Sequence, residues 1–116
     1  MPERDYLVVL RGAVQNPRNI LRVRIVTDRG AVVDFAAQYE ATIERRAYPV
    51  VRHDGSHGQG HRDPLDRRGE SVRKEWLPEH LTLAQSLTLG IRDVMEHWNG
   101  YRDAFLQRGL FNWSER

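Results

Sequence analysis

Most of the side chains that could do acid–base or phosphate chemistry lie in one short segment, residues 52–63. The segment holds three histidines, two aspartates and two arginines: Arg52, His53, Asp54, His57, His61, Arg62 and Asp63. Attack of an RNA 2′-hydroxyl on its neighbouring phosphate needs a base, an acid for the leaving oxygen and a cation for the developing charge. Histidine titrates near neutral pH, and arginine binds phosphate oxygens. The segment therefore predicts metal-independent cleavage of RNA.

Five residues of the segment are assigned roles in this predicted reaction. His57 and His61 are the candidates for base and acid. Arg52 and Arg62 would stabilise the charge on the phosphate. Asp54 would orient an imidazole by accepting its second N–H.

Two other interpretations of the same segment stay open. His53, His57 and His61 are spaced by four residues, and with Asp63 they could bind Zn²⁺ or Mn²⁺ from loop positions. The protein would then be a His/Asp metal-dependent hydrolase, whereas the first interpretation needs no cofactor. Alternatively, the polar residues cap turns in a solvated loop. The protein would then be a non-enzymatic module that binds RNA or an acidic protein partner.

The positive charge of the chain is concentrated in its middle. The formal net charge is only +2, but residues 45–74 contain eight basic and four acidic residues, a local net charge of +4. All but one of the 18 basic residues are arginine, whose planar fork of donors suits phosphate. Four basic residues after the histidine segment are expected to bind the substrate: Arg67, Arg68, Arg73 and Lys74. The chain has no Cys, which excludes disulfides, thiolate metal sites and cysteine nucleophiles.

Strands are predicted over the first half of the chain. Between about residues 5 and 53, apolar and polar residues alternate in runs separated by turn signals at residues 15–17 and 28–30, which indicates an antiparallel sheet. Pro49 in the last run predicts an edge position or a bulge. Residues 54–70 are rich in Gly and poor in apolar side chains, so we expect a long functional loop. A short strand is expected over residues 71–77.

One long amphipathic helix is predicted over residues 82–108. Thr82 and Gln85 have the spacing of a capping box. Apolar residues recur every three to four positions after them: Leu83, Leu87, Ile91, Val94, Trp98, Tyr101 and Phe105. Gly90 and Gly100 interrupt the helix and predict close packing or a slight bend.

The expected fold is one α+β domain over residues 1–116, with an antiparallel sheet of four to five strands packed against the C-terminal helix. Exposed aromatic rings would support RNA binding. Tyr39 and Tyr48 are expected in the core, whereas Phe111 and Trp113 follow the helix and would bind a partner or cover the sheet edge. No apolar run approaches the roughly 20 residues of a membrane span or resembles a signal peptide, so a cytoplasmic protein is expected.

Two groups of residues give the chain a resemblance to known families over about residues 48–106. They are Arg52-His53-Asp54-x-x-His57 followed by His61-Arg62-Asp63, and the ending Ile91-Arg92-Asp93-x-x-x-x-Trp98-x-x-Tyr101-Arg102-x-x-Phe105-Leu106. The pattern resembles a set of small uncharacterised prokaryotic proteins. More loosely, it resembles the TumE-type toxins of toxin–antitoxin modules, in which an Arg-aromatic-Asp segment precedes a His and a His-basic-His cluster.

The resemblance implies a small α+β toxin that is made beside a cognate antitoxin and acts on RNA. The residues that match the toxin motif are Arg52, Asp54, His57 and His61, with Arg62 at its basic position. The chain has His53 where the toxins have an aromatic residue, and Asp63 where they have the last His. The expected partners are therefore RNA and the antitoxin, with no membrane. A homodimer is compatible with the sequence.

Overall fold

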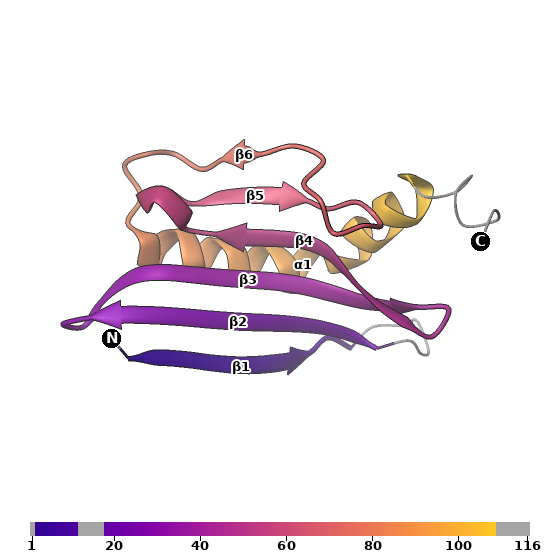
Figure 1. The fold of residues 1–116 in the computed structure, drawn as a ribbon, viewed down its shortest axis with the longest axis horizontal. Coiled ribbons are helices and arrows are strands. Elements are labelled where there is room, and N and C mark those ends of the chain that lie inside the picture. The colour runs from indigo at the N-terminus through magenta and orange to yellow at the C-terminus, as the bar shows by residue number, and fades with distance from the viewer. Residues whose placement is uncertain (1, 12–17, 109–116) are drawn as a thin grey trace.

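A computed structural model describes residues 2–11 and 18–108, and in these residues it shows a six-stranded antiparallel sheet with one helix on one face (Figure 1). The strands and the helix are β1 (Glu3–Val9), β2 (Asn19–Asp28), β3 (Ala31–Ile43), β4 (Arg46–Asp54), β5 (His61–Pro64), β6 (Glu75–Trp76) and α1 (Leu83–Arg108). The strands lie in the sheet in their chain order. The predicted α+β class is confirmed, with one strand more than expected.

The alternating pattern of the first half of the chain is confirmed by the burial of its side chains. Along β3, the residues from Phe35 to Ile43 are alternately buried and half-buried, and the buried ones face the helix. β2 and β3 are joined by a tight turn in which Arg29 and Gly30 have φ angles of 53° and 83°. A left-handed pair of this kind is typical of a two-residue hairpin loop. The turn signal at residues 15–17 lies outside the described residues.

Pro49 marks a β-bulge, one of the two outcomes that the sequence predicts. Tyr39 of β3 lies opposite Val51 of β4, but the next residue, Glu40, lies opposite Pro49, so Val50 is the extra residue. On its other side, β4 pairs with β5 only from Val51 onward. Pro49 has no backbone N–H, and at its position no N–H is needed for pairing with β5.

The prediction of one long loop over residues 54–70 is wrong, because this segment contains a 3₁₀ turn and a strand. After Asp54 the chain makes a short 3₁₀ turn, η1 (Ser56–Gly58), and returns as β5, whose His61 pairs with Asp54. The sequence of β5 is His-Arg-Asp-Pro, and its first three side chains hydrogen-bond to other polar side chains. An apolar periodicity, the main signal of a strand, is therefore missing from this segment. The strand expected over residues 71–77 is reduced to the two residues of β6.

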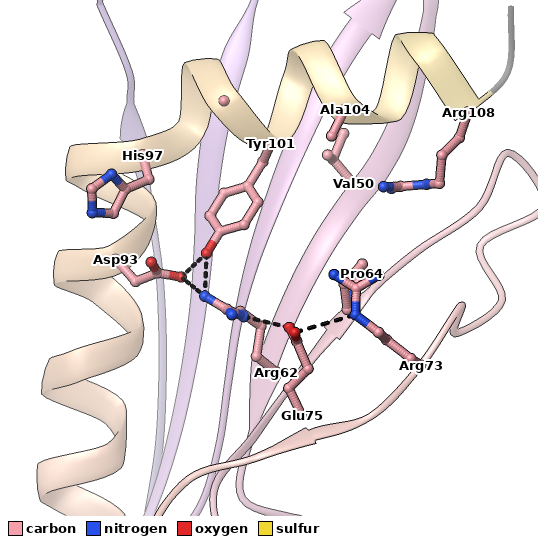
Figure 2. Close-up of a pocket in the computed structure, with 11 residues that line it drawn as sticks. Val50, Arg62, Pro64, Arg73, Glu75, Asp93, His97, Tyr101, Ala104 and Arg108 are labelled. Carbon is pink, nitrogen blue, oxygen red and sulfur yellow. Dashed lines mark hydrogen bonds and ion pairs between the residues drawn. The ribbon is translucent and has the colours of Figure 1, made fainter.

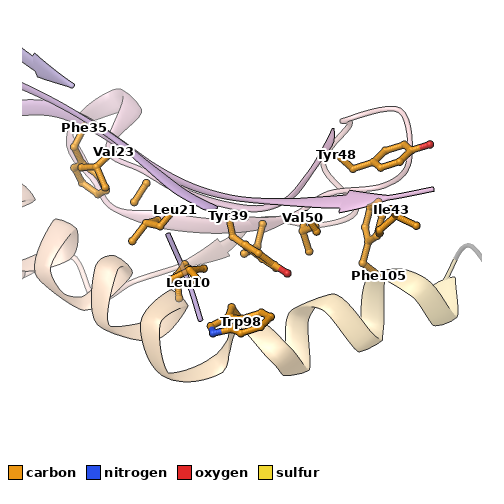
Figure 3. Packing of buried hydrophobic residues seen from close by; sticks show 14 of the residues in the cluster. Leu10, Leu21, Val23, Phe35, Tyr39, Ile43, Tyr48, Val50, Trp98 and Phe105 are labelled. Carbon is orange, nitrogen blue, oxygen red and sulfur yellow. The ribbon is translucent and has the colours of Figure 1, made fainter. Parts of the chain in front are cut away.

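The helix begins where the capping box predicts. The backbone N–H of Thr82 donates to Gln85 Oε1 at 2.8 Å, and the backbone N–H of Gln85 donates to Thr82 Oγ1 at 3.0 Å. The apolar stripe of α1 packs on the central strands (Figure 3). Tyr39 and Trp98 meet edge to face with ring centroids 6.0 Å apart, and the buried Tyr39 hydroxyl donates to Asn19 Oδ1 at 2.6 Å. Tyr39 and Tyr48 therefore both lie in the core, as predicted.

Glycines allow the first half of α1 to approach β4 and β5 closely. A Cβ atom at Gly90 would lie 2.8 Å from Cγ of His53, and one at Gly60 would lie 2.6 Å from Cβ of Ser86. Side chains at these positions would push the helix off the sheet. At Gly100 a Cβ atom would meet nothing within 4 Å, so only the first of the two helix glycines marks close packing. No helix in the described ranges is long and apolar enough to cross a membrane.

Candidate functional site

The alternation of β4 and β5 divides the predicted site between the two faces of the sheet. His53 and Arg62 point to the face that α1 covers, where both reach Asp93 of the helix. Arg52 lies on the opposite face, where its guanidinium donates to Gln38 Oε1 at 2.6 and 2.8 Å. Successive side chains of a strand point to opposite faces, so residues 52–63 cannot form one continuous site.

On the face away from α1, His61 lies between two carboxylates. Its Nε2 atom is 2.7 Å from Asp54 Oδ1, and its Nδ1 atom is 2.6 Å from Asp63 Oδ1. The ring is only 1% exposed. Both ring nitrogens face carboxylate oxygens within hydrogen-bond distance. Since neither nitrogen is open to a substrate, His61 cannot act as acid or base in this arrangement.

This group of Asp54, His61 and Asp63, which we term the carboxylate clamp, also holds the surrounding segments. The hydroxyl of Ser56 in η1 donates to Asp54 Oδ1 at 2.9 Å and lies 3.2 Å from His61 Nε2. The His61 ring meets the Trp76 ring of β6 edge to face, with 5.1 Å between the centroids. The clamp therefore connects β4, η1, β5 and β6.

His57, the other predicted acid–base residue, is not part of the clamp. It lies in η1 with a left-handed backbone (φ 66°), and its side chain is exposed. Within the described ranges no hydrogen bond or ion pair joins His57 to His61. The structure therefore does not bring the predicted acid–base pair together.

The four residues of the alternative metal site are also dispersed. His53 faces α1, His57 is exposed in η1, and His61 and Asp63 hydrogen-bond to each other on the far face. In the part of the chain that the structure describes, no three side chains of the metal-binding kinds lie close enough to hold an ion. The structure therefore does not bring the four residues of the predicted metal site together.

On the helix face, Asp93 is the centre of a hydrogen-bond network. Its Oδ2 atom is 2.8 Å from His53 Nε2, accepts a short hydrogen bond from the Tyr101 hydroxyl, and lies 3.4 Å from Arg62 Nη1. Burial alone would raise the pKa of the Asp93 carboxyl, but the hydrogen bonds from His53 and Tyr101 outweigh it and lower that pKa to about 2. Burial and the hydrogen bond to Asp93 raise the pKa of Tyr101 above its usual range. Asp93 is therefore an anion, and Tyr101 keeps its proton.

Arg62 links this network to β6. Its Nη1 atom donates to the Tyr101 hydroxyl at 2.6 Å, and its Nε atom donates to Glu75 Oε1 at 2.7 Å (Figure 2). The other Glu75 oxygen accepts from Arg73 Nε at 3.2 Å. Burial would lower the pKa of Arg62, but the hydrogen bond to Glu75 and the charge interactions with Tyr101, Glu75 and Asp93 together outweigh it, and the pKa is raised. Arg62 is therefore held in place as a permanent cation.

These residues line a pocket of about 480 Å³ between α1 and the β5–β6 edge of the sheet, which we term the basic pocket. Its charged walls are Arg62, Arg73, Arg108, Glu75 and Asp93, so three cations face two anions and the net charge is +1 without His97. Burial and the nearby charge of Arg73 lower the pKa of Arg108, whose Nη2 atom donates to the Leu65 carbonyl at 3.1 Å. An anion between Arg73 and Arg108 would relieve their repulsion.

The four predicted substrate-binding residues lie in different places. Arg73 lines the basic pocket, whereas Lys74 points to the other side of the chain, with its Nζ atom 3.7 Å from Asp63 Oδ2. Arg68 lies in an exposed turn, and Arg67, beside it, is half-buried. Arg73 is thus the one member of this set that lines the basic pocket.

The prediction from sequence missed the helix side of the pocket. Asp93, His97, Tyr101, Ala104 and Arg108 all line it, and their spacing of three to four residues places them on one face of α1. That spacing is visible in the sequence as a second, more polar stripe beside the apolar one. It could have identified the helix as a contributor to the site.

Comparisons with known proteins bear on the family of the chain. No curated protein and no solved structure matches it, and the resemblance to TumE-type toxins stays a prediction. One family model matches residues 1–109, almost the whole chain. The chain therefore belongs to the family defined by the domain of unknown function DUF7718.

Proposed function

We propose that the protein acts on RNA and binds the RNA backbone in the basic pocket. The observation that carries the proposal is the convergence of three arginines on one pocket from separate parts of the chain. Arg62 comes from β5, Arg73 from the segment before β6, and Arg108 from the end of α1.

The charge of the pocket suits a phosphodiester. A phosphodiester carries one negative charge, and the charged lining has a net charge of +1. Guanidinium groups bind phosphate oxygens through paired N–H donors. Arg62 is bonded to Glu75, Tyr101 and Asp93, and its side chain is 33% exposed. Arg73 is bonded to Glu75 through Nε and is 58% exposed, and Arg108 is bonded to a backbone carbonyl through Nη2. Arg73 and Arg108 are therefore the groups that would turn toward an incoming phosphate.

The resemblance to TumE-type toxins adds a biological setting. We propose a ribonuclease-like toxin of a toxin–antitoxin module, with its cognate antitoxin as a protein partner. His97 lines the basic pocket and is exposed, so it can supply an imidazole beside a bound phosphate. This makes His97 a candidate for acid–base chemistry in place of the enclosed His61.

A non-enzymatic RNA-binding module is the second candidate function. It is favoured by the separation of His57 from His61 and by the engagement of both His61 nitrogens with carboxylates. In that case the basic pocket would bind RNA without cleaving it.

RNA binding is tested with the double variant Arg73→Gln and Arg108→Gln, against the control Arg29→Gln in the β2–β3 turn. Binding of a fluorescent single-stranded RNA is measured by anisotropy at several salt concentrations. We expect the wild type and the control to bind, and the double variant to bind more weakly. The slope of log affinity against log salt should fall by about 0.7 for each arginine lost. Equal binding by the double variant and the wild type would refute the proposal.

The two candidate functions are separated by incubating the protein with RNA without added metal. Cleavage that is lost in His97→Ala and kept in the exposed control His80→Ala supports the ribonuclease. Binding without cleavage, and without growth arrest on expression, supports the binding module.

A further inference from the structure

We infer that the RNA bound at the basic pocket is single-stranded and that one of its bases stacks on Trp76. This inference rests on the proposed RNA binding and adds the class of RNA and the residue that selects it. Trp76 is 51% exposed, which makes it the most exposed aromatic side chain in the described part of the chain. An exposed tryptophan beside a cationic surface is a typical platform for single-stranded RNA.

Trp76 is next in the chain to Glu75, a wall of the basic pocket, but its side chain lies on the opposite face of the sheet. β6 is the last strand of the sheet, and its two side chains point to opposite faces. Glu75 lines the pocket, whereas Trp76 lies on the other face, where Lys74 also lies. An RNA strand that crosses the outer edge of β6 would place a phosphate near Arg73 and a base on the indole ring.

The indole ring is held in position before any ligand arrives. The His61 ring packs edge to face against it at an interplanar angle of 66°, and the carboxylate clamp fixes His61. A platform that is already ordered loses less conformational entropy on binding. This assigns the buried His61 a positioning role: it supports the ring that contacts the base.

A base that stacks on Trp76 must displace the Lys74 side chain from the indole ring. Its Nζ atom lies over the indole ring, 5.6 Å from the centroid, and its side chain is 40% exposed. An exposed cation–π contact is weaker than the stacking of a base on an aromatic ring, so the base displaces it. The ammonium group keeps a partner when it leaves the ring, because Asp63 Oδ2 lies 3.7 Å from Nζ.

A duplex cannot use this platform, because its bases are stacked on one another and paired. Tyr39 and Tyr48 are buried in the core and offer no alternative surface. Tyr6, the other clearly exposed aromatic residue of the described ranges, lies on β1 at the opposite edge of the sheet. The inference therefore predicts a preference for unpaired RNA that depends on Trp76.

The experiment compares the wild type, Trp76→Ala and Trp76→Phe as full chains. The probes are a single-stranded RNA, the same strand with abasic sites, and its duplex. We expect Trp76→Ala to weaken binding of the intact strand roughly 5- to 150-fold, with Trp76→Phe close to the wild type. The salt slope should not change, because no cation is lost. Abasic RNA should bind equally to the wild type and to Trp76→Ala.

Each other outcome overturns the inference. If Trp76→Ala binds the intact strand as the wild type does while the Arg73/Arg108 double variant binds weakly, stacking is refuted and the proposed function stands. If the wild type binds the duplex as tightly as the single strand, the preference for unpaired RNA is refuted. If Trp76→Ala instead loses a protein partner with RNA binding intact, Trp76 is a protein contact. If the wild type binds no RNA, the proposed function and this inference both fail. Far-UV circular dichroism confirms that the variants are folded.

Discussion

Asp93 is the residue on which the helix-face network depends, because His53, Tyr101 and Arg62 all reach the same carboxylate oxygen. It is half-buried, with 19% of its side chain exposed, and its charge is balanced by partners from β4 and β5. A carboxylate in this position stabilises the folded protein only while it is ionised.

The Asp93→Asn variant is therefore expected to change how stability depends on pH. The pKa of Asp93 is lowered from 3.8 to about 2 on folding, so the ionised form favours the folded state. The wild type should be more stable than the variant by ~2 kcal/mol above pH 4, and this advantage should disappear as the pH falls toward 2. Urea denaturation across this pH range measures it. Asp103→Asn, an exposed change on the same helix, should show no such dependence.

The chemistry of single residues could be predicted only in part. The concentration of His, Asp and Arg in residues 52–63 is visible in the sequence, since residue types and spacing can be read from it. The sequence does not show that His53 and His61 point to opposite faces, because that requires β5 to be recognised as a strand. It also cannot show that both ring nitrogens of His61 contact carboxylates, because Asp54 reaches His61 only when β4 pairs with β5.

At the scale of elements, the position of α1 depends on Gly90, the helix glycine that lies against the sheet. A Cβ atom at Gly90 would meet His53 in β4, whereas a Cβ atom at Gly100 would meet nothing within 4 Å. The two residues lie in the same helix and therefore form a matched pair for a test of close packing.

Gly90→Ala and Gly100→Ala should have opposite effects on stability. The new methyl group at position 90 would meet the His53 ring at 2.8 Å, so we expect a loss of about 1–3 kcal/mol and disturbance of the His53–Asp93 contact. At position 100, alanine has the better helix propensity and meets nothing, so a gain of up to about 1 kcal/mol is expected. Thermal or urea unfolding measures both. Stabilisation by Gly90→Ala would contradict the close approach of helix and sheet.

The elements themselves were predictable where one face is apolar. The strands β2 and β3 and the helix have clear periods of two and of three to four residues, and the capping box of Thr82 fixes where the helix begins. β5 and β6 could not be predicted in the same way. They are short and polar, and they are stabilised by ion pairs with residues distant in the sequence, such as Arg62 with Glu75.

Across the whole molecule, the strands differ in how much of each is exposed to solvent. β3 lies between two strands and under the helix, and its second half is largely buried. β1 pairs with β2 alone, and nearly all of its side chains are exposed. The stability of the two regions against local opening should therefore differ.

Amide hydrogen exchange followed by mass spectrometry should show this difference. We expect the amides of β3 to exchange slowest and to report global unfolding. Those of β1 should exchange much faster, because opening of an edge strand exposes little apolar surface. Equal protection of β1 and β3 would mean that a further partner covers the β1 edge in solution.

The order of the strands has a consequence for how the protein folds. Each strand pairs only with its neighbours in the chain, so the sheet can assemble as successive hairpins during synthesis. The basic pocket cannot form at that stage, because one wall of it comes from the last half of α1, the final element of the described chain. A nascent or truncated chain would therefore have most of its strands before it has the basic pocket, and the proposed binding of RNA would begin only when the helix docks.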